Sequence, residues 1–189
     1  MYAGHFAAAL ALRAKAPRAP FWALLAGAAW LDLLHGALVL AAIERVHPDG
    51  TAYLGYRLDY LPWSHSLVAA LVWSGLAAAL FAKRGRDVAI AVGLAVFSHW
   101  ALDALVHEHD LPLAPGLPFT VGLNLWGIWP LGAWLVEGAI VAAGVMIYLR
   151  ASAAAHRWRV ALVLAIVHLS FAPPLNPLHL AGEYFSRSS

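Results

Sequence analysis

Four long apolar runs, of 19 to 23 residues each, limit what this 189-residue chain can fold into. At a rise of about 1.5 Å per residue, a helix of that length crosses a hydrocarbon layer of about 30 Å. Only 12% of the residues are charged, about half of what a soluble domain carries. We therefore predict an all-α, polytopic transmembrane helix bundle that forms a single integral membrane domain over residues 1–189.

Five membrane-spanning helices are expected. The first four follow directly from the long runs, whereas the fifth meets several prolines near its end and is expected to break there. The apolar segment Tyr2–Leu12 is too short to span a membrane, so we expect a half-length helix that dips into the bundle. The predicted spans cover residues of about 21–43, 63–82, 88–106, 128–149 and 160–180.

Lysine and arginine are concentrated in alternate loops between the predicted spans. Positively charged loops stay on the cytoplasmic side of a membrane, so these loops are predicted to be cytoplasmic. The loops 44–62 and 107–127 then face the opposite side. Arginines this dispersed among short loops also argue against a nucleic-acid surface. Nine of the twelve basic residues belong to the cytoplasmic set: Arg13, Lys15, Arg18, Lys83, Arg84, Arg86, Arg150, Arg157 and Arg159.

Several ionisable side chains fall inside the predicted spans, where each costs about 2.5–3.5 kcal/mol on insertion scales. Counted along the helices, they lie between the middle of the membrane and its outer boundary, and the half-length helix would bring His5 to the same depth. The residues within the spans are Asp32, His35, His65, His99, Asp103, Glu137 and His168.

The spacing of these residues favours a metal site near the non-cytoplasmic face. His99, Asp103 and His107 form a stripe on one helix face, and Asp32 and His35 lie one turn apart on another helix. Histidine nitrogens and carboxylate oxygens bind Zn²⁺, and the chain has no cysteine to offer a thiolate. No lysine or arginine lies within the spans to balance the carboxylates, and a divalent ion would supply that charge.

Two other interpretations of these polar residues stay open. The cluster could be a set of hydrogen bonds and ion pairs without metal, which for His35 or His168 alone is as plausible as ligation. Glu137 could be a further ligand, a general base, or a partner that orients a ligating histidine. It could also accept a hydrogen bond from a neighbouring Trp or Ser.

Four short motifs occur in a characteristic order on the predicted helices. They resemble the G-H, D, T-H-S and S-H-x-x-x-D motifs of the YdjM-like bacterial membrane-bound metal-dependent hydrolases, over about residues 4 to 126. The last motif is also similar to one in zinc-dependent phospholipase C and P1-type nucleases. In this chain the motifs read Gly4-His5, Leu31-Asp32, Trp63-Ser64-His65-Ser66 and Ser98-His99-Trp100-Ala101-Leu102-Asp103.

The resemblance implies a metal-dependent hydrolase of the bacterial inner membrane. Together with the charge pattern of the loops, it leads us to expect a multi-pass protein whose site faces the periplasmic or external side. By this likeness His5, Asp32, His65, His99 and Asp103 are the metal ligands. The family's first aspartate usually sits in a Pro-Asp-x-Asp-His string and its second motif reads His-Arg-Gly-x-Thr-His-Ser. Both are only partly present here. His35 and His107 are possible further ligands, because each lies one helical turn from a predicted ligand.

We therefore expect one or two divalent ions, with Zn²⁺ favoured, and a lipid or lipid-linked substrate. A metal ion lowers the pKa of bound water towards about 7 and polarises an ester or phosphodiester under attack. Asp103 and Glu137 are the candidate catalytic carboxylates. A metal-ion or proton transporter is the alternative, although the cytoplasmic halves of the spans hold scarcely a polar side chain. A non-catalytic metal-stabilised scaffold is a third interpretation.

Overall fold

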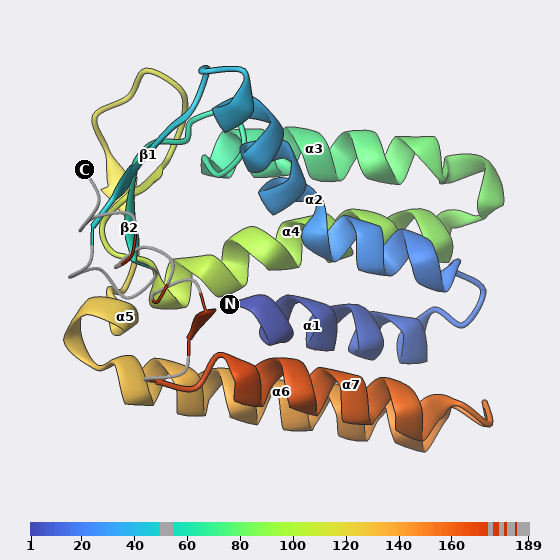
Figure 1. Ribbon diagram of the computed structural model, residues 1–189. Coiled ribbons are helices and arrows are strands. Elements are labelled where there is room, and N and C mark those ends of the chain that lie inside the picture. Colours follow the sequence, from blue (N-terminus) through green and yellow to red (C-terminus); the bar gives the residue numbers. More distant parts are fainter. Residues whose placement is uncertain (50–54, 174–175, 178–179, 181–183, 185–189) are drawn as a thin grey trace.

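The protein is mostly helical in the part that the computed structural model describes, which is residues 1–49, 55–173, 176, 177, 180 and 184. The helices run roughly along one direction, and two small β-hairpins lie at one end of the bundle (Figure 1). The helices are α1 (Tyr2–Lys15), α2 (Phe21–Leu40), α3 (Leu67–Leu80), α4 (Arg86–Val106), α5 (Leu125–Ile128), α6 (Pro130–Ala151) and α7 (Arg157–Ser170), with a 3₁₀ turn η1 at Ala82–Arg84.

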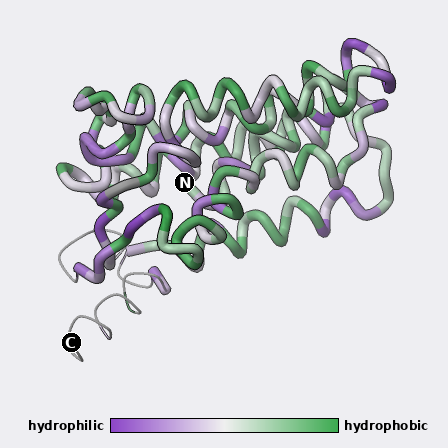
Figure 2. The backbone as a smooth tube through the Cα atoms, turned by 90° about the horizontal axis from the view of Figure 1, so that it is seen from above, coloured by the Kyte–Doolittle hydropathy of each residue, from purple (hydrophilic) through white to green (hydrophobic). Residues whose placement is uncertain are grey.

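Three helices, α2, α4 and α6, are long and apolar enough to cross a membrane, with 20, 21 and 22 residues. Figure 2 shows hydrophobic residues along much of the helices and hydrophilic ones in the loops that join them. The membrane bundle is thus confirmed in outline, but five spans are not. Helices α3 and α7 have 14 residues each, and the end of the predicted fifth span lies partly outside the described residues.

Helix α3 begins at Leu67, four residues later than predicted, because Ser66 caps it. The Ser66 hydroxyl accepts a hydrogen bond from the backbone N–H of Ala69 and donates one to the carbonyl of Pro62. This is an N-cap arrangement, which satisfies a backbone donor that the first helical turn leaves unpaired. The residues before the cap form a turn, and this turn holds His65 in the interior.

Helix α1 is the half-length helix expected from the sequence, and it is embedded among α2, α4, α6 and α7. Its first residue lies inside the bundle, and the helix runs towards the end opposite the hairpins (Figure 1). Small residues permit this packing. A Cβ atom added at Gly144 of α6 would lie 2.4 Å from the carbonyl oxygen of Ala7, so the glycine lets the two backbones approach closely.

The two hairpins were not predicted. Strand β1 (Arg45–Pro48) pairs antiparallel with β2 (Tyr56–Tyr60), and β3 (Leu111–Pro112) pairs antiparallel with β4 (Thr120–Val121). They occupy the loops that the charge pattern assigns to the non-cytoplasmic side. Together with α5 they cover that end of the bundle (Figure 1).

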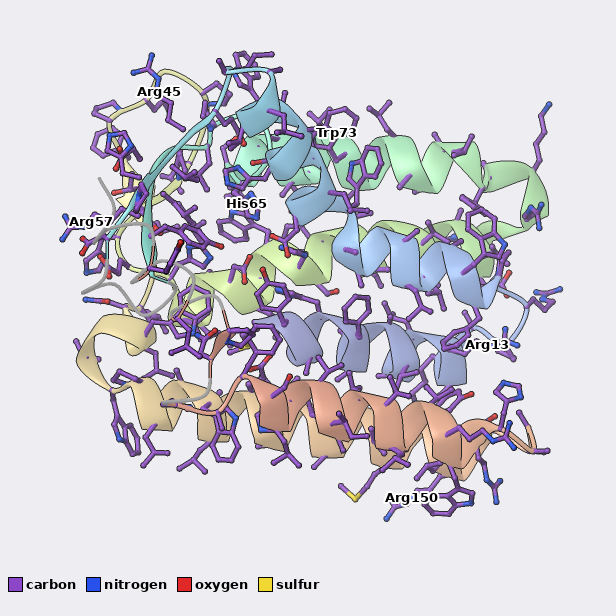
Figure 3. The ribbon with its side chains drawn as sticks, in the orientation of Figure 1. Arg13, Arg45, Arg57, His65, Trp73 and Arg150 are labelled. Atoms are coloured by element: carbon purple, nitrogen blue, oxygen red, sulfur yellow. The ribbon has the colours of Figure 1, made fainter. Side chains whose placement is uncertain are left out.

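Basic residues mark the opposite end. The loops α1–α2, α3–α4 and α6–α7 lie there, and these loops together with the adjoining helix ends carry the nine lysines and arginines of the predicted cytoplasmic set. In Figure 3, Arg13 and Arg150 lie at this end, while Arg45 and Arg57 lie with the hairpins. The structure thus has one strongly basic end and one end built from hairpins.

Candidate metal centre

Four buried side chains and the exposed Asp32 meet in one cluster, and they come from α1, α2, the turn before α3, and α4. Their nitrogen and oxygen atoms form two groups, each within 4.8 Å, which share His99. Figure 3 shows His65 in the half of the bundle nearest the hairpins. The first group is His5, His99 and Asp103, and the second is Asp32, His65 and His99. These are the five residues predicted as ligands, and as placed here they could hold a metal ion.

Four nitrogen–oxygen distances in this cluster are close to the spacing of ligands around one ion, although Asp32 and Asp103 fall in different groups. His99 Nε2 lies 3.1 Å from Asp103 Oδ2 and 3.4 Å from Asp32 Oδ1. His65 Nε2 lies 3.5 Å from Asp32 Oδ1 and 3.7 Å from Asp103 Oδ2. Ligands at 2.0–2.2 Å from a tetrahedral Zn²⁺ are separated by about 3.3–3.6 Å. The four measured separations bracket that edge length.

His5 faces the other oxygen of Asp103. Its Nε2 lies 3.2 Å from Asp103 Oδ1, and the amino group of Met1 donates a hydrogen bond to the same oxygen at 3.0 Å. The imidazole of His5 stacks on that of His99, with ring centroids 3.7 Å apart. Asp103 therefore joins both groups, with one oxygen towards His5 and the other towards His65 and His99.

Hydrogen bonds to the far ring nitrogens set the tautomers of two histidines. His99 Nδ1 lies 2.6 Å from the carbonyl oxygen of Ala28, and a carbonyl can only accept, so Nδ1 carries the proton. His107 Nδ1 lies 3.0 Å from Asp110 Oδ1 and donates to it in the same way. Partners of this kind orient metal-ligating histidines and leave Nε2 free to bind.

In the neutral form, His99 directs an Nε2 lone pair at carboxylate oxygens. This nitrogen is fully buried and has no hydrogen-bond partner among the described residues. Lone pairs that face each other at 3.1–3.4 Å repel, so the arrangement needs a cation between them or protons on the imidazoles. A divalent ion satisfies both carboxylates and the imidazoles at once, which fits the chemistry of this donor set.

His35 and His107 lie beside the cluster but outside both groups. His35 Nδ1 is 2.6 Å from Glu44 Oε2, and His107 Nε2 is 3.8 Å from Asp103 Oδ2. Both residues line a small cavity at the centre of the cluster. They could surround an ion or its bound water, but they belong to neither of the two groups that could hold the ion.

Glu137 is buried on α6, and its carboxylate is turned towards α1. It accepts a hydrogen bond from the backbone N–H of Gly4 at 3.0 Å, next to His5, and lies 3.7 Å from His168 Nδ1. The hydrogen bond is to backbone and not to the Trp or Ser considered from the sequence. Glu137 thereby holds the first turn of α1, which carries His5, and it belongs to neither group.

Glu44 is the buried residue that the sequence analysis missed. Its carboxylate accepts hydrogen bonds from the backbone N–H groups of Trp63 and Ser64, from the Ser64 hydroxyl and from His35. Burial alone would raise the pKa of Glu44, but the bonds from His35 and Ser64 outweigh it and keep this pKa below its ordinary value. Its only signal in the sequence is an acidic residue directly after the first span.

Two cavities adjoin the cluster. One, of about 40 Å³, is lined by four of the predicted ligands among other residues, and it exceeds the 10–15 Å³ that a single water molecule needs. The other, of about 580 Å³, lies between the two hairpins. Both are lined by Tyr56, Leu58 and Trp126, which separate them. Burial and the nearby Asp32 charge raise the pKa of Tyr56 to about 12, so its hydroxyl stays a donor at neutral pH.

Exposure differs sharply within the cluster. The side chain of Asp32 is 45% exposed, whereas those of His5, His65, His99 and Asp103 are at most 4% exposed. One side of the cluster is therefore accessible from outside and the rest is enclosed by protein.

Comparison with known proteins identifies no relative of this chain. No protein-family model matches the chain, no curated protein matches it, and no solved structure matches its fold.

Proposed function

We propose that the protein is a membrane-embedded metal-dependent hydrolase. Its divalent ion, with Zn²⁺ the favoured metal, is held by Asp32, His65, His99 and Asp103, with His5 against the second oxygen of Asp103. The observation that carries this proposal is the set of four nitrogen–oxygen separations of 3.1–3.7 Å that link Asp32 and Asp103 to His65 and His99, with the Nε2 of the buried His99 left without a hydrogen-bond partner among the described residues. The amino group of Met1 balances the charge of Asp103, but no buried lysine or arginine among the described residues lies beside Asp32, and a divalent ion would supply the remaining positive charge.

The chemistry follows from the one accessible side of the cluster. A divalent ion there would supply a Lewis acid and activate water. The exposed Asp32 leaves room for water on its side, and the protonated Tyr56 hydroxyl is a donor at the wall towards the larger cavity. Asp103 and Glu137 remain the candidate catalytic carboxylates, Asp103 as a ligand and Glu137 as a general base next to the helix turn that carries His5.

A lipid-borne ester or phosphodiester fits this site best, and we place it on the periplasmic side of a bacterial inner membrane. The basic end of the bundle favours the cytoplasm, which leaves the cluster near the opposite face. The cavity between the hairpins is within the size range of ligand sites, and it shares Tyr56, Leu58 and Trp126 with the small cavity at the cluster. A substrate with a polar head in this cavity and chains in the membrane would reach the cluster.

Transport is supported less well. Between the cluster and the basic end, the described interior is packed with buried apolar side chains from α1, α2 and α4, including Leu10, Leu24, Val88 and Val92. A permeation path needs polar groups along its length. The arrangement fits a cup that is accessible from one side.

The metal content of purified protein tests the proposal. We expect wild-type protein prepared without chelators to carry a stoichiometric divalent transition metal, and His99→Ala to lose it. Asp87→Asn, in an exposed ion pair with Arg18 at the basic end, should keep the metal. Wild-type protein that neither contains such a metal nor binds Zn²⁺ on titration would contradict the metal site.

Turnover is tested separately, with metal-loaded protein in vesicles that contain phospholipids or lipid-linked phosphates. Hydrolysis by wild-type protein and Asp87→Asn but not by His99→Ala is the expected result. If no ester or phosphodiester in a broad panel is cleaved while the metal is bound, the hydrolase proposal fails and the metal-stabilised scaffold is favoured.

A further inference from the structure

The side chain of Glu44 is fully buried, and its hydrogen-bond partners Trp63, Ser64 and His35 are not among the five proposed ligands. Its two oxygens have separate sets of partners. Oε1 accepts from the backbone N–H groups of Trp63 and Ser64, each at 2.9 Å. Oε2 lies 2.6 Å from the Ser64 hydroxyl and 2.6 Å from His35 Nδ1. Four short contacts on one buried carboxylate indicate a built network.

The network extends to His65 through a single hydroxyl. Ser64 Oγ lies 2.8 Å from His65 Nδ1 as well as 2.6 Å from Glu44 Oε2. A hydroxyl has one proton to donate, and an ionised carboxylate can only accept. Ser64 must therefore donate to Glu44, and it can only accept from His65. The proton of a neutral His65 imidazole is then on Nδ1, and Nε2 carries the lone pair.

From this geometry we propose that Glu44 is a positioning residue for the metal centre, which fixes the metal-binding tautomer of His65 through Ser64. The inference rests on the proposed metal site, because its consequence is the direction of the His65 Nε2 lone pair. That atom lies 3.5 Å from Asp32 Oδ1 and 3.7 Å from Asp103 Oδ2, at the centre of the cluster. Glu44 thus does for His65 what the Ala28 carbonyl does for His99.

An isosteric substitution at Glu44 reverses the direction of the hydrogen bonds that link it through Ser64 to His65. In Glu44→Gln the amide oxygen can keep both backbone N–H partners, which places the NH₂ group where Oε2 was. This group donates to Ser64 Oγ, so the Ser64 proton turns towards His65 Nδ1. His65 then becomes the Nε2–H tautomer, whose Nε2 has no lone pair for a metal. The shape of the network is preserved, but the tautomer that it selects changes.

Zn²⁺ affinity of the purified full-length chain in detergent measures the effect. Loss of an outer partner of a ligating histidine weakens metal binding by about 10–100-fold, and we expect Glu44→Gln to fall in this range. Asp87→Asn, a carboxylate-to-amide change at the other end of the bundle, should bind Zn²⁺ as wild type does. A folded Glu44→Gln protein that binds Zn²⁺ within threefold of wild type would overturn the proposal.

A second readout does not depend on metal. In metal-free, ¹⁵N-histidine-labelled protein, the ring nitrogen shifts of His65, assigned with His65→Gln, report which nitrogen is protonated. The proposal expects Nδ1–H in wild type and Nε2–H in Glu44→Gln, and the same tautomer in both would refute it. If wild type fails to bind Zn²⁺ but the tautomer still switches, Glu44 keeps this role while the proposed function fails.

Ser64→Ala covers the case in which Glu44→Gln does not fold. The substitution removes the hydroxyl that links Glu44 to His65, and it places no new donor in the network. We expect a mixture of His65 tautomers and Zn²⁺ binding weaker than wild type. An unchanged, pure Nδ1–H tautomer in Ser64→Ala would show that another group sets it and would also overturn the proposal.

Discussion

At the scale of single residues, the cluster is held by partners that leave each side chain little freedom. His99 is oriented by a backbone carbonyl, His107 by Asp110, and His5 by stacking on His99. Such fixed orientation is what a metal ligand requires, because ligation demands a lone pair at a defined point. If these buried residues only formed hydrogen bonds with one another, each ring nitrogen would have a partner, whereas His99 Nε2 has none among the described residues.

Glu137 allows a prediction at this scale. In Glu137→Gln the amide oxygen can still accept from Gly4 N–H, so the first turn of α1 and the fold should be kept. We expect the variant to retain its metal and to lose turnover by about 10²–10⁴-fold if Glu137 is a general base. Metal content, thermal unfolding and turnover on the same preparation check this, and normal turnover would exclude the base role.

The proposed ligands could be predicted from the sequence, but the network behind them could not. Asp32, His99 and Asp103 stand out because an ionisable residue within an apolar run is costly, and helical spacing puts the last two on one face. Glu44 reaches Ser64 across 20 residues of chain through a hairpin and a turn. No spacing rule links such positions.

At the scale of secondary structure, α1 is the element that completes the site. It is 14 residues long, and it brings His5 to Asp103 because its small residues lie against α6 and α4. A polar or bulky helix of this length could not lie so deep among longer ones. Its position also explains why Glu137 faces inwards, where it meets the N–H of Gly4.

The contact between α1 and α6 gives the next prediction. In Gly144→Ala the new methyl group would lie 2.4 Å from the carbonyl oxygen of Ala7, so α1 must move. We expect a loss of about 1–3 kcal/mol in stability from overpacking and weaker Zn²⁺ binding through displaced His5. Gly75→Ala is the matched control, because nothing lies within 4 Å of its added methyl group. Equal unfolding temperatures for the two variants would contradict the packing argument.

Hydropathy predicted the lengths of three of the four long runs, whereas the run at 63–82 contains a helix of only 14 residues. The hydropathy of the chain predicts helices α2, α4 and α6. It does not predict the two hairpins, which lie in loops whose charge shows only the side of the membrane. The strand Tyr56–Tyr60 does alternate, with Arg57 and Asp59 more exposed than Tyr56 and Leu58. This period of two is a strand signal, but it covers only five residues. Its partner β1 has too little alternation to show that the two strands pair.

At the scale of the whole molecule, charge and chemistry are separated along the bundle axis. The three loops and adjoining helix ends at one end hold nine of the twelve basic residues, and the hairpins, the large cavity and the candidate metal centre lie towards the other end. This asymmetry makes the orientation in a membrane decisive for function. A site accessible from the periplasm meets outer-leaflet lipids, whereas the reverse orientation would present it to the cytoplasm.

Single-cysteine labelling tests that orientation, and the chain is suited to it because it has no native cysteine. Leu117→Cys places an exposed thiol between β3 and β4, and Lys83→Cys places one in the α3–α4 loop at the basic end. Leu117 is preferred to the neighbouring Gly116, whose φ of +79° would strain a cysteine. In right-side-out bacterial spheroplasts, a membrane-impermeant maleimide should label Leu117→Cys at once and Lys83→Cys only after permeabilisation, because the basic loops stay cytoplasmic. The reverse pattern would place the metal centre on the cytoplasmic side and remove the argument for a periplasmic lipid substrate, while leaving the metal-binding predictions unaffected.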